Sequence, residues 1–307
     1  MVDKFKEEQL KKELARIPGE SIVVVQDEDI VKVHVHTLKP GNALNIAQRF
    51  GEFVKLKIEN MQEQADTIQS NAGTIVGVDD NAKPKREAKE TAVISVCAGD
   101  GLKDAFLELH CDYVVSGGQT MNPSAEDMVQ AVRDVNAKNV IILPNNSNIV
   151  MTAQQTATIL EDEVNVIVIP TKTIPQGLSA CIMFNPDASL DDNVAEMTEA
   201  VGNVKTGQVT FAIKDTNIDG VEIKANDYMA LVEKDIVACK DNKLKALKVV
   251  LEKLVDEDAE LITLIYGEDV NDDDIEEIES FVEDNFEAEL EVVNGKQPVY
   301  SFIVGVE

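Results

Sequence analysis

The chain has 307 residues, 44% of them hydrophobic, which is enough for two or three domains with cores of their own. Its 57 acidic and 28 basic side chains give a net charge of −29. This charge excludes nucleic acid as a partner, because phosphate binding depends on lysine and arginine. No run approaches the roughly 18 apolar residues of a membrane span, and the first residues lack the apolar core of a signal peptide. We therefore expect a cytoplasmic protein without a transmembrane segment.

The acidic excess lies almost entirely in the later part of the chain. Residues 1–91 have a net charge of −2, whereas residues 92–307 have a net charge of −27. Within 256–291 there are 17 acidic residues and no lysine or arginine. Two interpretations stay open from composition: a solvated surface that keeps the protein soluble, and a surface that attracts a basic protein partner.

Residues 1–61 form the first predicted domain. The elements expected in it are a charged amphipathic helix over 1–17, strands at 21–25 and 30–36, a helix beginning at Pro40, and a strand over 53–58. The order α-β-β-α-β is that of a small ferredoxin-like α+β unit without its first strand. We therefore expect the chain to begin inside a domain.

His34 and His36 lie two residues apart on the second of these strands, so their side chains are expected to point to the same face. Two such imidazoles can chelate a metal such as zinc or share a proton-transfer step. The neighbouring sequence offers no obvious third ligand. A polar, solvent-facing strand gives the same pattern and is the more common origin of such a pair.

Residues 62–90 lack hydrophobic periodicity and are predicted to link two domains. The region 91–188 then repeats apolar strand, turn and helix, with apolar runs at 92–97, 113–115, 140–143 and 164–169. Runs that are apolar throughout are typical of parallel strands covered by helices on both faces. The pattern predicts a parallel α/β subdomain.

The loops that follow these strands are the predicted ligand sites, because open α/β sheets bind ligands at the carboxyl ends of their strands. One loop combines two glycines with hydroxyl groups, before a helix that Ser124 and Asp127 are expected to cap. The other, over 170–177, carries a threonine and the one lysine in its vicinity. The candidates for holding a carboxylate or phosphate are Ser116, Gly117, Gly118, Thr120, Ser124, Thr171 and Lys172.

Residues 189–307 mix helices with alternating strands and are predicted to form an acidic α+β subdomain. Its helix over 270–284 places Ile275, Ile278, Phe281 and Val282 on a buried side. The outward-facing candidates for docking a partner are Asp272, Asp273, Asp274, Glu276, Glu277 and Glu283. No Walker, GxGxxG or HExxH motif occurs, so we expect no nucleotide-dependent chemistry from this chain alone.

The four cysteines, at positions 97, 111, 181 and 239, show no CxxC spacing. Two of them, Cys97 and Cys181, occur in apolar or helical contexts. We therefore expect free thiols in a reducing compartment and no disulfide framework.

Long motifs occur in a characteristic order along the chain. They are VKVHVHT (31–37) with Pro40 and Gly41, KIENM (57–61), SGGQTMNPS (116–124), NVIILPNN (139–146), IPTKTIPQG (169–177), KTG (205–207) and IYGED (265–269). Together they resemble the kinase (A) subunit of bacterial fatty acid kinase, a dihydroxyacetone-kinase-like family. The resemblance covers essentially the whole chain and corresponds to the middle and C-terminal portions of the family proteins.

The resemblance implies part of a transferase that serves phospholipid synthesis. In the family, an N-terminal domain that this chain does not match binds ATP and Mg²⁺. The middle domain mediates homodimerisation and supplies a cysteine and two histidines for phosphoryl transfer. His34 and His36 match the two histidines, whereas the cysteine would lie upstream of Met1.

The C-terminal part of the family is similar in fold to its partner, a fatty-acid-binding protein of the DegV type, with one parallel and one mixed subdomain. The resemblance implies that this part receives a basic surface of the carrier on an acidic groove. Of the two interpretations of the acidic surface, the resemblance favours binding of a basic partner over a role in solubility alone.

Three hypotheses follow, in this order. The first is a docking and dimerisation portion of fatty acid kinase without kinase activity of its own. The second is a lipid- or small-acid-binding module that uses the loops after the parallel strands. The third is a metal-dependent enzyme centred on His34 and His36.

Overall fold

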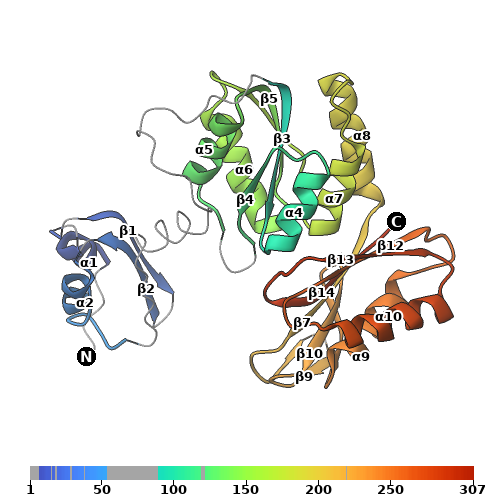
Figure 1. The fold of residues 1–307 in the computed structure, drawn as a ribbon. Coiled ribbons are helices and arrows are strands. Elements are labelled where there is room, and N and C mark those ends of the chain that lie inside the picture. Colours follow the sequence, from blue (N-terminus) through green and yellow to red (C-terminus); the bar gives the residue numbers. More distant parts are fainter. Residues whose placement is uncertain are drawn as a thin grey trace, which may run out of the picture. The chain divides into compact units, whose positions relative to one another are not determined.

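The computed structural model describes residues 7–14, 16–17, 19–27, 30–37, 39–53, 89–118, 122–218 and 220–307. The chain divides into two compact units, Met1–Asp80 and Asn81–Glu307. Figure 1 labels the helices and strands of both units.

The first unit has the predicted order of helix, two strands and helix. Helix α1 (Glu7–Leu14) precedes strands β1 (Gly19–Asp27) and β2 (Ile30–Thr37), which pair antiparallel, and helix α2 (Pro40–Ala47) follows. The buried residues Leu10, Leu14, Ile17, Val24 and Ala43 form its core. Of the strand expected over 53–58, Phe53 is exposed and lies in neither helix nor strand, and the rest lies outside the described residues.

The second unit begins with a parallel sheet of strand order β4-β3-β5-β6. Its strands are β3 (Lys89–Cys97), β4 (Tyr113–Ser116), β5 (Ala137–Leu143) and β6 (Asn165–Val168), and all three pairings are parallel. Strands β3 and β5 lie in the centre of the sheet, and six consecutive residues of β3, from Ala92 to Cys97, are buried. The prediction of a parallel α/β layer is thus confirmed.

Helices cover both faces of this sheet (Figure 1). Helices α5 (Ala125–Val135) and α6 (Ser147–Ile159) bury Met128, Val132 and Ile149 against one face. Helices α4 (Asp100–Glu108), α7 (Ile174–Met183) and α8 (Leu190–Asn203) cover the other. This double cover explains why the strands are apolar throughout.

The remainder of the unit is a mixed sheet of strand order β11-β10-β7-β14-β12-β13. Its members are β7 (Lys205–Phe211), β10 (Tyr228–Val232), β11 (Asp235–Lys240), β12 (Leu261–Tyr266), β13 (Glu289–Asn294) and β14 (Tyr300–Val306), with a hairpin of β8 (Thr216–Ile218) and β9 (Val221–Ile223) beside it. Of the pairings in this sheet, that between β12 and β13 is parallel and the others are antiparallel.

One face of the mixed sheet is covered by helices α9 (Lys243–Leu254) and α10 (Asp272–Asn285). In α10 the residues Ile275, Ile278 and Val282 are buried and Phe281 packs beside them, as the helical spacing predicts. The opposite face meets the parallel layer, because Ile265 and Ile303 share a core cluster with Leu178 of α7. The two layers therefore form one packed body.

Two expected boundaries differ from the structure. Strand β3 begins at Lys89, so the predicted linker 62–90 includes its first two residues. Helix α8 follows the expected boundary at 188/189, yet it packs against α7 and buries Met197 in the core of the parallel layer. The layers change at Val204, between α8 and β7. Local patterning does not show which layer an amphipathic helix covers, because its apolar stripe fits either.

All four cysteines are free; Cys97, Cys111 and Cys181 are buried and Cys239 is partly buried. Burial raises the pKa of the Cys97 thiol to about 12, so it stays protonated. Among the described residues, no helix has both the length and the apolar character needed to cross a bilayer.

Candidate functional site

The predicted ligand loops meet at the carboxyl edge of the parallel sheet. Gly117 and Gly118 follow β4, Asn145 and Asn146 follow β5, and Lys172 lies between β6 and α7. Together with the segment 297–300, which precedes and begins β14, they line a narrow cleft of about 70 Å³. Small-molecule sites are typically about 300 to 1,000 Å³, so this cleft is too small for an acyl chain.

Thr171 is fully buried and holds loops of the sheet edge together. Its Oγ1 accepts a hydrogen bond from the Asn145 backbone N–H at 2.9 Å and donates one to Asn145 Oδ1 at 2.8 Å. The Asn145 amide Nδ2 donates to Ser95 Oγ at 2.7 Å and to the Val96 carbonyl at 3.0 Å. The hydroxyl of Thr171 is therefore used inside the protein and does not face a ligand.

Ser124 has a local structural role as well. Its Oγ accepts the Asp127 backbone N–H at 3.1 Å, and the Asp127 carboxylate accepts the Ser124 backbone N–H at 2.9 Å. This is the capping box predicted from the sequence, and it fixes the start of α5. Of the other loop candidates, Ser116 and Lys172 are exposed, Gly117 is buried, and Thr120 lies outside the described residues.

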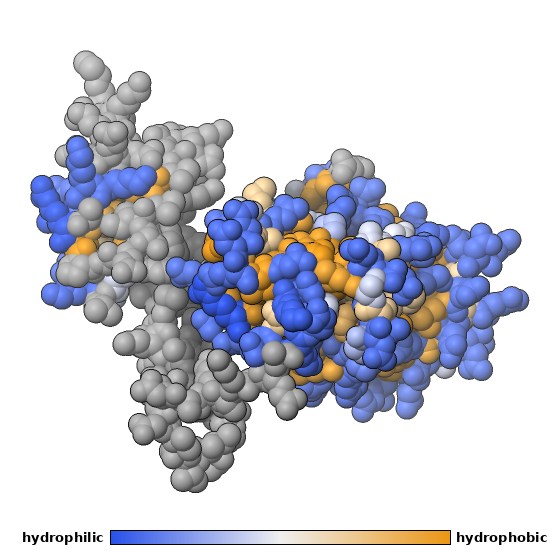
Figure 2. All heavy atoms as spheres, turned by 90° about the horizontal axis from the view of Figure 1, so that it is seen from above, coloured by the Kyte–Doolittle hydropathy of each residue, from blue (hydrophilic) through white to orange (hydrophobic). Residues whose placement is uncertain are grey.

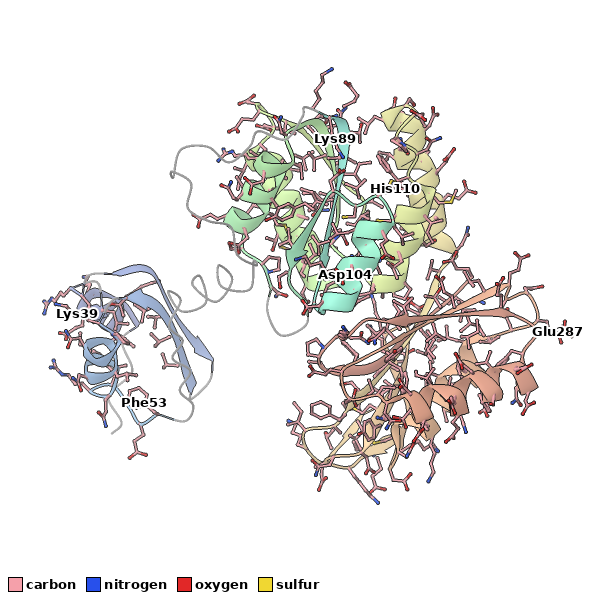
Figure 3. All side chains as sticks on the ribbon, viewed as in Figure 1. Lys39, Phe53, Lys89, Asp104, His110 and Glu287 are labelled. Atoms are coloured by element: carbon pink, nitrogen blue, oxygen red, sulfur yellow. The ribbon has the colours of Figure 1, made fainter. Side chains whose placement is uncertain are left out.

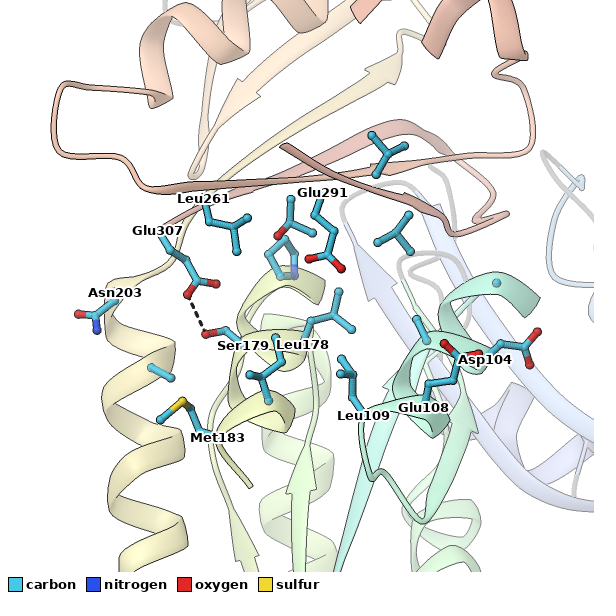
Figure 4. A pocket seen from close by; sticks show the side chains of 18 of the residues that line it. Asp104, Glu108, Leu109, Leu178, Ser179, Met183, Asn203, Leu261, Glu291 and Glu307 are labelled. Carbon is cyan, nitrogen blue, oxygen red and sulfur yellow. Dashed lines mark hydrogen bonds between the residues drawn. The ribbon is translucent and has the colours of Figure 1, made fainter. Parts of the chain in front are cut away.

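A much larger hollow, of about 910 Å³, lies between the two layers of the second unit (Figure 4). Helices α4, α7 and α8 form one wall, and β12, β13 and Glu307 form the other. We call it the interlayer groove. Its acidic lining residues are Asp104, Glu108, Glu196, Glu199, Glu291 and Glu307, and its apolar lining residues include Leu109, Leu178, Ile182, Met183, Leu261 and Val292.

The charges in the groove are almost all of one sign. Six carboxylates line it, and Lys296 is the one basic side chain among the described residues of its lining. In Figure 4, Glu291 and Glu307 point from the mixed sheet towards α7, and Asp104 and Glu108 come from α4. Carboxylates that share a concave surface reinforce one another's field, so the groove favours a cationic ligand.

The geometry of β12 places two of these carboxylates on one face of the mixed sheet. Glu291 pairs with Thr263, and the backbone of Glu307 accepts and donates hydrogen bonds with that of Leu261. Leu261 and Thr263 lie two residues apart, so their side chains share a face, and both line the groove. Glu291 and Glu307 therefore flank β12 on opposite sides, with their Cα atoms about 12 Å apart, because they are two strand spacings apart across the sheet and two residues apart along it.

The pKa of the Glu307 carboxyl is raised above its ordinary value of 4.5. Burial is the larger cause and the charge of Glu291 adds to it, while a hydrogen bond from Ser179 Oγ at 3.3 Å acts in the opposite direction. Ionisation of Glu307 thus costs free energy in the folded protein, and a neighbouring cation would offset that cost.

This shift predicts a pH dependence of stability. A raised pKa in an acid stabilises the fold below the ordinary value of 4.5, and that contribution is lost as pH rises through the raised pKa. Glu307→Gln cannot ionise at this position, so it should not lose this contribution. We therefore expect the Tm of the variant, relative to that of the wild type, to increase as pH rises from about 4 to 8. Thermal unfolding of both proteins across this range checks it. Parallel profiles would show that Glu307 is not perturbed.

The acidic candidates on α10 divide into two groups. Asp274 belongs to the N-terminal capping box of the helix and forms an ion pair with Lys243 at 2.9 Å, in which both side chains are mostly buried. Glu277 pairs with Lys248 at 2.7 Å. The remaining candidates, Asp272, Asp273, Glu276 and Glu283, are exposed. Hydrophilic side chains cover much of the face of the second unit that is seen in Figure 2. Figure 3 shows the side chains of the described residues as sticks.

His34 and His36 occupy alternate positions of β2, where their Cα atoms pair with those of Val23 and Glu20. Their side chains lie outside the described residues, so the expected metal or phosphoryl-transfer role stays a prediction. Among the described residues, no cluster of three or more histidine, cysteine or acidic side chains could hold a metal ion.

The sequence did not reveal the interlayer groove. Its carboxylates come from α4, α8, β13 and Glu307, which are separated by up to about 200 residues along the chain. Its apolar lining residues Ile182 and Met183, at the end of α7, are 57% and 41% exposed in the structure. That exposure depends on tertiary packing, so no local sequence pattern indicated it.

The second unit has the two-layer fold of known fatty-acid-binding and kinase structures. A hypothetical protein from Thermotoga maritima, reported to have a fatty acid binding function, has a TM-score of 0.52 and 13% identity over 71% of this chain and 99% of its own. The dihydroxyacetone kinase of C. freundii has a TM-score of 0.55 and 9% identity over 83% of this chain and 57% of its own. At these identities the likeness shows the fold alone.

Sequence comparisons define the family. The FakA-like model of the fatty acid kinase C-terminal domain matches residues 92–307, and that of the middle domain matches residues 1–68. The chain therefore belongs to the FakA-like family of fatty acid kinase subunits. Protein YloV of Bacillus subtilis is 44% identical over 304 residues, and an uncharacterised protein of Staphylococcus aureus is 42% identical over 305. Each match covers 99% of this chain, which spans about half, 54%, of the relative's length.

Proposed function

We propose that this chain is the part of a fatty acid kinase that docks a fatty-acid-binding carrier of the DegV type. The carrier would present its acyl carboxylate for ATP-dependent phosphorylation by a separate ATP- and Mg²⁺-binding domain. The observation that carries the proposal is the interlayer groove, whose described lining has six carboxylates and one lysine. The net charge of −27 over residues 92–307 adds long-range attraction for a basic carrier surface.

The first unit has a separate role in this proposal. His34 and His36 take part in phosphoryl transfer, and the unit joins two copies of the protein. The chain by itself should show no ATPase or kinase activity, because its described residues include neither a phosphate-binding loop nor a cluster for Mg²⁺.

Binding to the carrier tests the docking role. We expect the chain to form a complex with the matching DegV-type protein in sedimentation at about 0.05 M salt. The complex should weaken as salt rises towards 0.5 M, because exposed charge pairs are screened within about 10 Å at 0.1 M salt. A complex with the same affinity at both concentrations would contradict docking through charge. Absence of binding at low salt would overturn the proposed function itself.

Binding of a lipid or small acid at the sheet edge is the alternative function. The cleft of about 70 Å³ has room for a carboxylate group beside Lys172 and Gly118, and not for the chain attached to it. Mass spectrometry of small molecules released from the purified protein distinguishes the two proposals. A stoichiometric small carboxylic acid would favour the alternative, and protein free of bound acid would favour docking.

A further inference from the structure

The interlayer groove combines two properties that point to one kind of ligand. Its apolar lining includes the exposed side chains of Ile182 and Met183, with Leu109 and Leu178 beside them. Large apolar side chains exposed inside a concave surface gain free energy when an apolar ligand surface covers them. The apolar lining therefore selects a partner with an apolar face.

Acidic residues flank this lining on three sides. Asp104 and Glu108 lie four residues apart on α4, and Glu196 and Glu199 lie three apart on α8, so each pair shares one helix face. Glu291 and Glu307 approach from the mixed sheet (Figure 4). A ligand seated on the apolar residues is thus met by carboxylates from both layers.

These properties exclude several occupants. An anionic membrane surface would be repelled by the carboxylates, and so would a second copy of a chain with a net charge of −29. A free fatty acid would place its own carboxylate among six others. An amphipathic helix with a basic polar face satisfies both requirements, because it presents apolar side chains on one stripe and lysine or arginine along its borders.

We propose that the interlayer groove binds a basic amphipathic helix of the carrier, with its apolar stripe on Ile182 and Met183 and one of its cationic side chains between Glu291 and Glu307. This inference rests on the proposed docking function and identifies its place and the partner's chemistry. It moves the docking surface away from α10, where Asp274 and Glu277 already form ion pairs.

The position between Glu291 and Glu307 is suited to a cation for a specific reason. The two carboxylates repel each other, and Glu307 is half-buried, so water screens its charge only in part. A lysine or arginine placed there interacts with both, and the hydroxyl of Ser179 already orients Glu307. The bound helix would thereby be fixed in register as well as attracted.

Charge-matched variants test the proposal. The double variant Glu291→Gln/Glu307→Gln should weaken binding of the DegV-type carrier by about tenfold or more, because it removes both partners of the cation. The control Asp272→Asn/Asp273→Asn removes the same amount of charge from the exposed start of α10 and should change the Kd by less than about twofold. Isothermal titration with purified carrier measures both.

A second pair of variants tests the apolar contact. Ile182→Ser removes an exposed side chain from the groove and should weaken binding by about fivefold. Met151→Ser on α6 removes a side chain that is 78% exposed outside the groove and should leave the Kd unchanged. The substituted positions other than Glu307 are exposed, and glutamine has almost the same size as the half-buried Glu307 side chain that it replaces, so the variants should fold. Thermal unfolding of each variant checks this.

The outcomes separate failure of the inference from failure of the docking function. If the wild type binds the carrier and the groove variants bind equally well, the inference is wrong and the docking function stands at another surface. A loss confined to Asp272→Asn/Asp273→Asn would place that surface on α10. If the wild type does not bind the carrier, the docking function and this inference both fail.

Discussion

Gly101→Ala is expected to lower the free energy of unfolding by about 3 kcal/mol. A Cβ atom at position 101 of α4 would lie 1.8 Å from the backbone carbonyl oxygen of Asn294 and 3.0 Å from the carbonyl carbon of Gly295. The two backbones are held together there, because the Leu102 N–H donates a hydrogen bond to the Gly295 carbonyl at 3.0 Å. Room for a methyl group therefore requires separating α4 from the mixed sheet.

Gly202→Ala is the matched control for this substitution. Gly202 also lies in a helix, α8, but an added Cβ would meet no atom within 4 Å. Alanine there should stabilise the protein by about 0.5 to 1 kcal/mol, because it restricts the unfolded chain without a clash. Urea unfolding of both variants measures the difference. Equal stability of Gly101→Ala and the wild type would show that the two layers are free to separate at this point.

Asn145→Ala should cost about 3 kcal/mol of stability. The substitution leaves Ser95 Oγ, the Val96 carbonyl and Thr171 Oγ1 without their amide partner at a buried position. Asn145 also has a φ angle of +55°, which asparagine adopts more readily than alanine. The expected loss of stability is large because buried polar groups without a hydrogen-bond partner retain their full desolvation cost.

Chemical denaturation with two companions checks this prediction. Thr171→Val keeps the shape of the side chain and removes only its hydroxyl, so we expect a smaller loss of about 1 to 2 kcal/mol. Asn148→Ala, at an exposed position in the first turn of α6, should change stability by less than about 0.5 kcal/mol. If Thr171→Val and Asn145→Ala were both neutral, these residues would be available to a ligand, as the sequence pattern predicts for Thr171.

The interlayer groove makes docking depend on the packing of the two layers. Its lining comes from α4, α7 and α8 on one side and from β12 and β13 on the other. A ligand in the groove would contact both layers, so carrier binding and the packing between layers should stabilise each other. Gly101 lies at this boundary and itself lines the groove, so one of the two largest expected losses of stability occurs beside the proposed docking surface.

Sequence patterns predicted many of the local elements and the family, but not the start of α7 at Ile174, inside the loop expected over 170–177, nor the hairpin of β8 and β9. The parallel strands were predicted from runs such as 92–97 and 140–143, because burial on both faces removes alternation. The capping box of Ser124 and Asp127 and the buried stripe of α10 were also predicted correctly, since these features depend on residues within one or two turns. The long motifs indicated the family because both their amino-acid sequences and their order along the chain are specific to it.

Packing between distant segments determines which of the candidate residues are available to a partner. Thr171 was a ligand candidate in the sequence, but its hydroxyl is bound to Asn145, which lies 26 residues away. The layer to which α8 belongs and the convergence of Glu199, Glu291 and Glu307 in one groove depend on contacts of the same kind. Such packing minimises exposed apolar area over the whole body, and no local window of sequence contains that information.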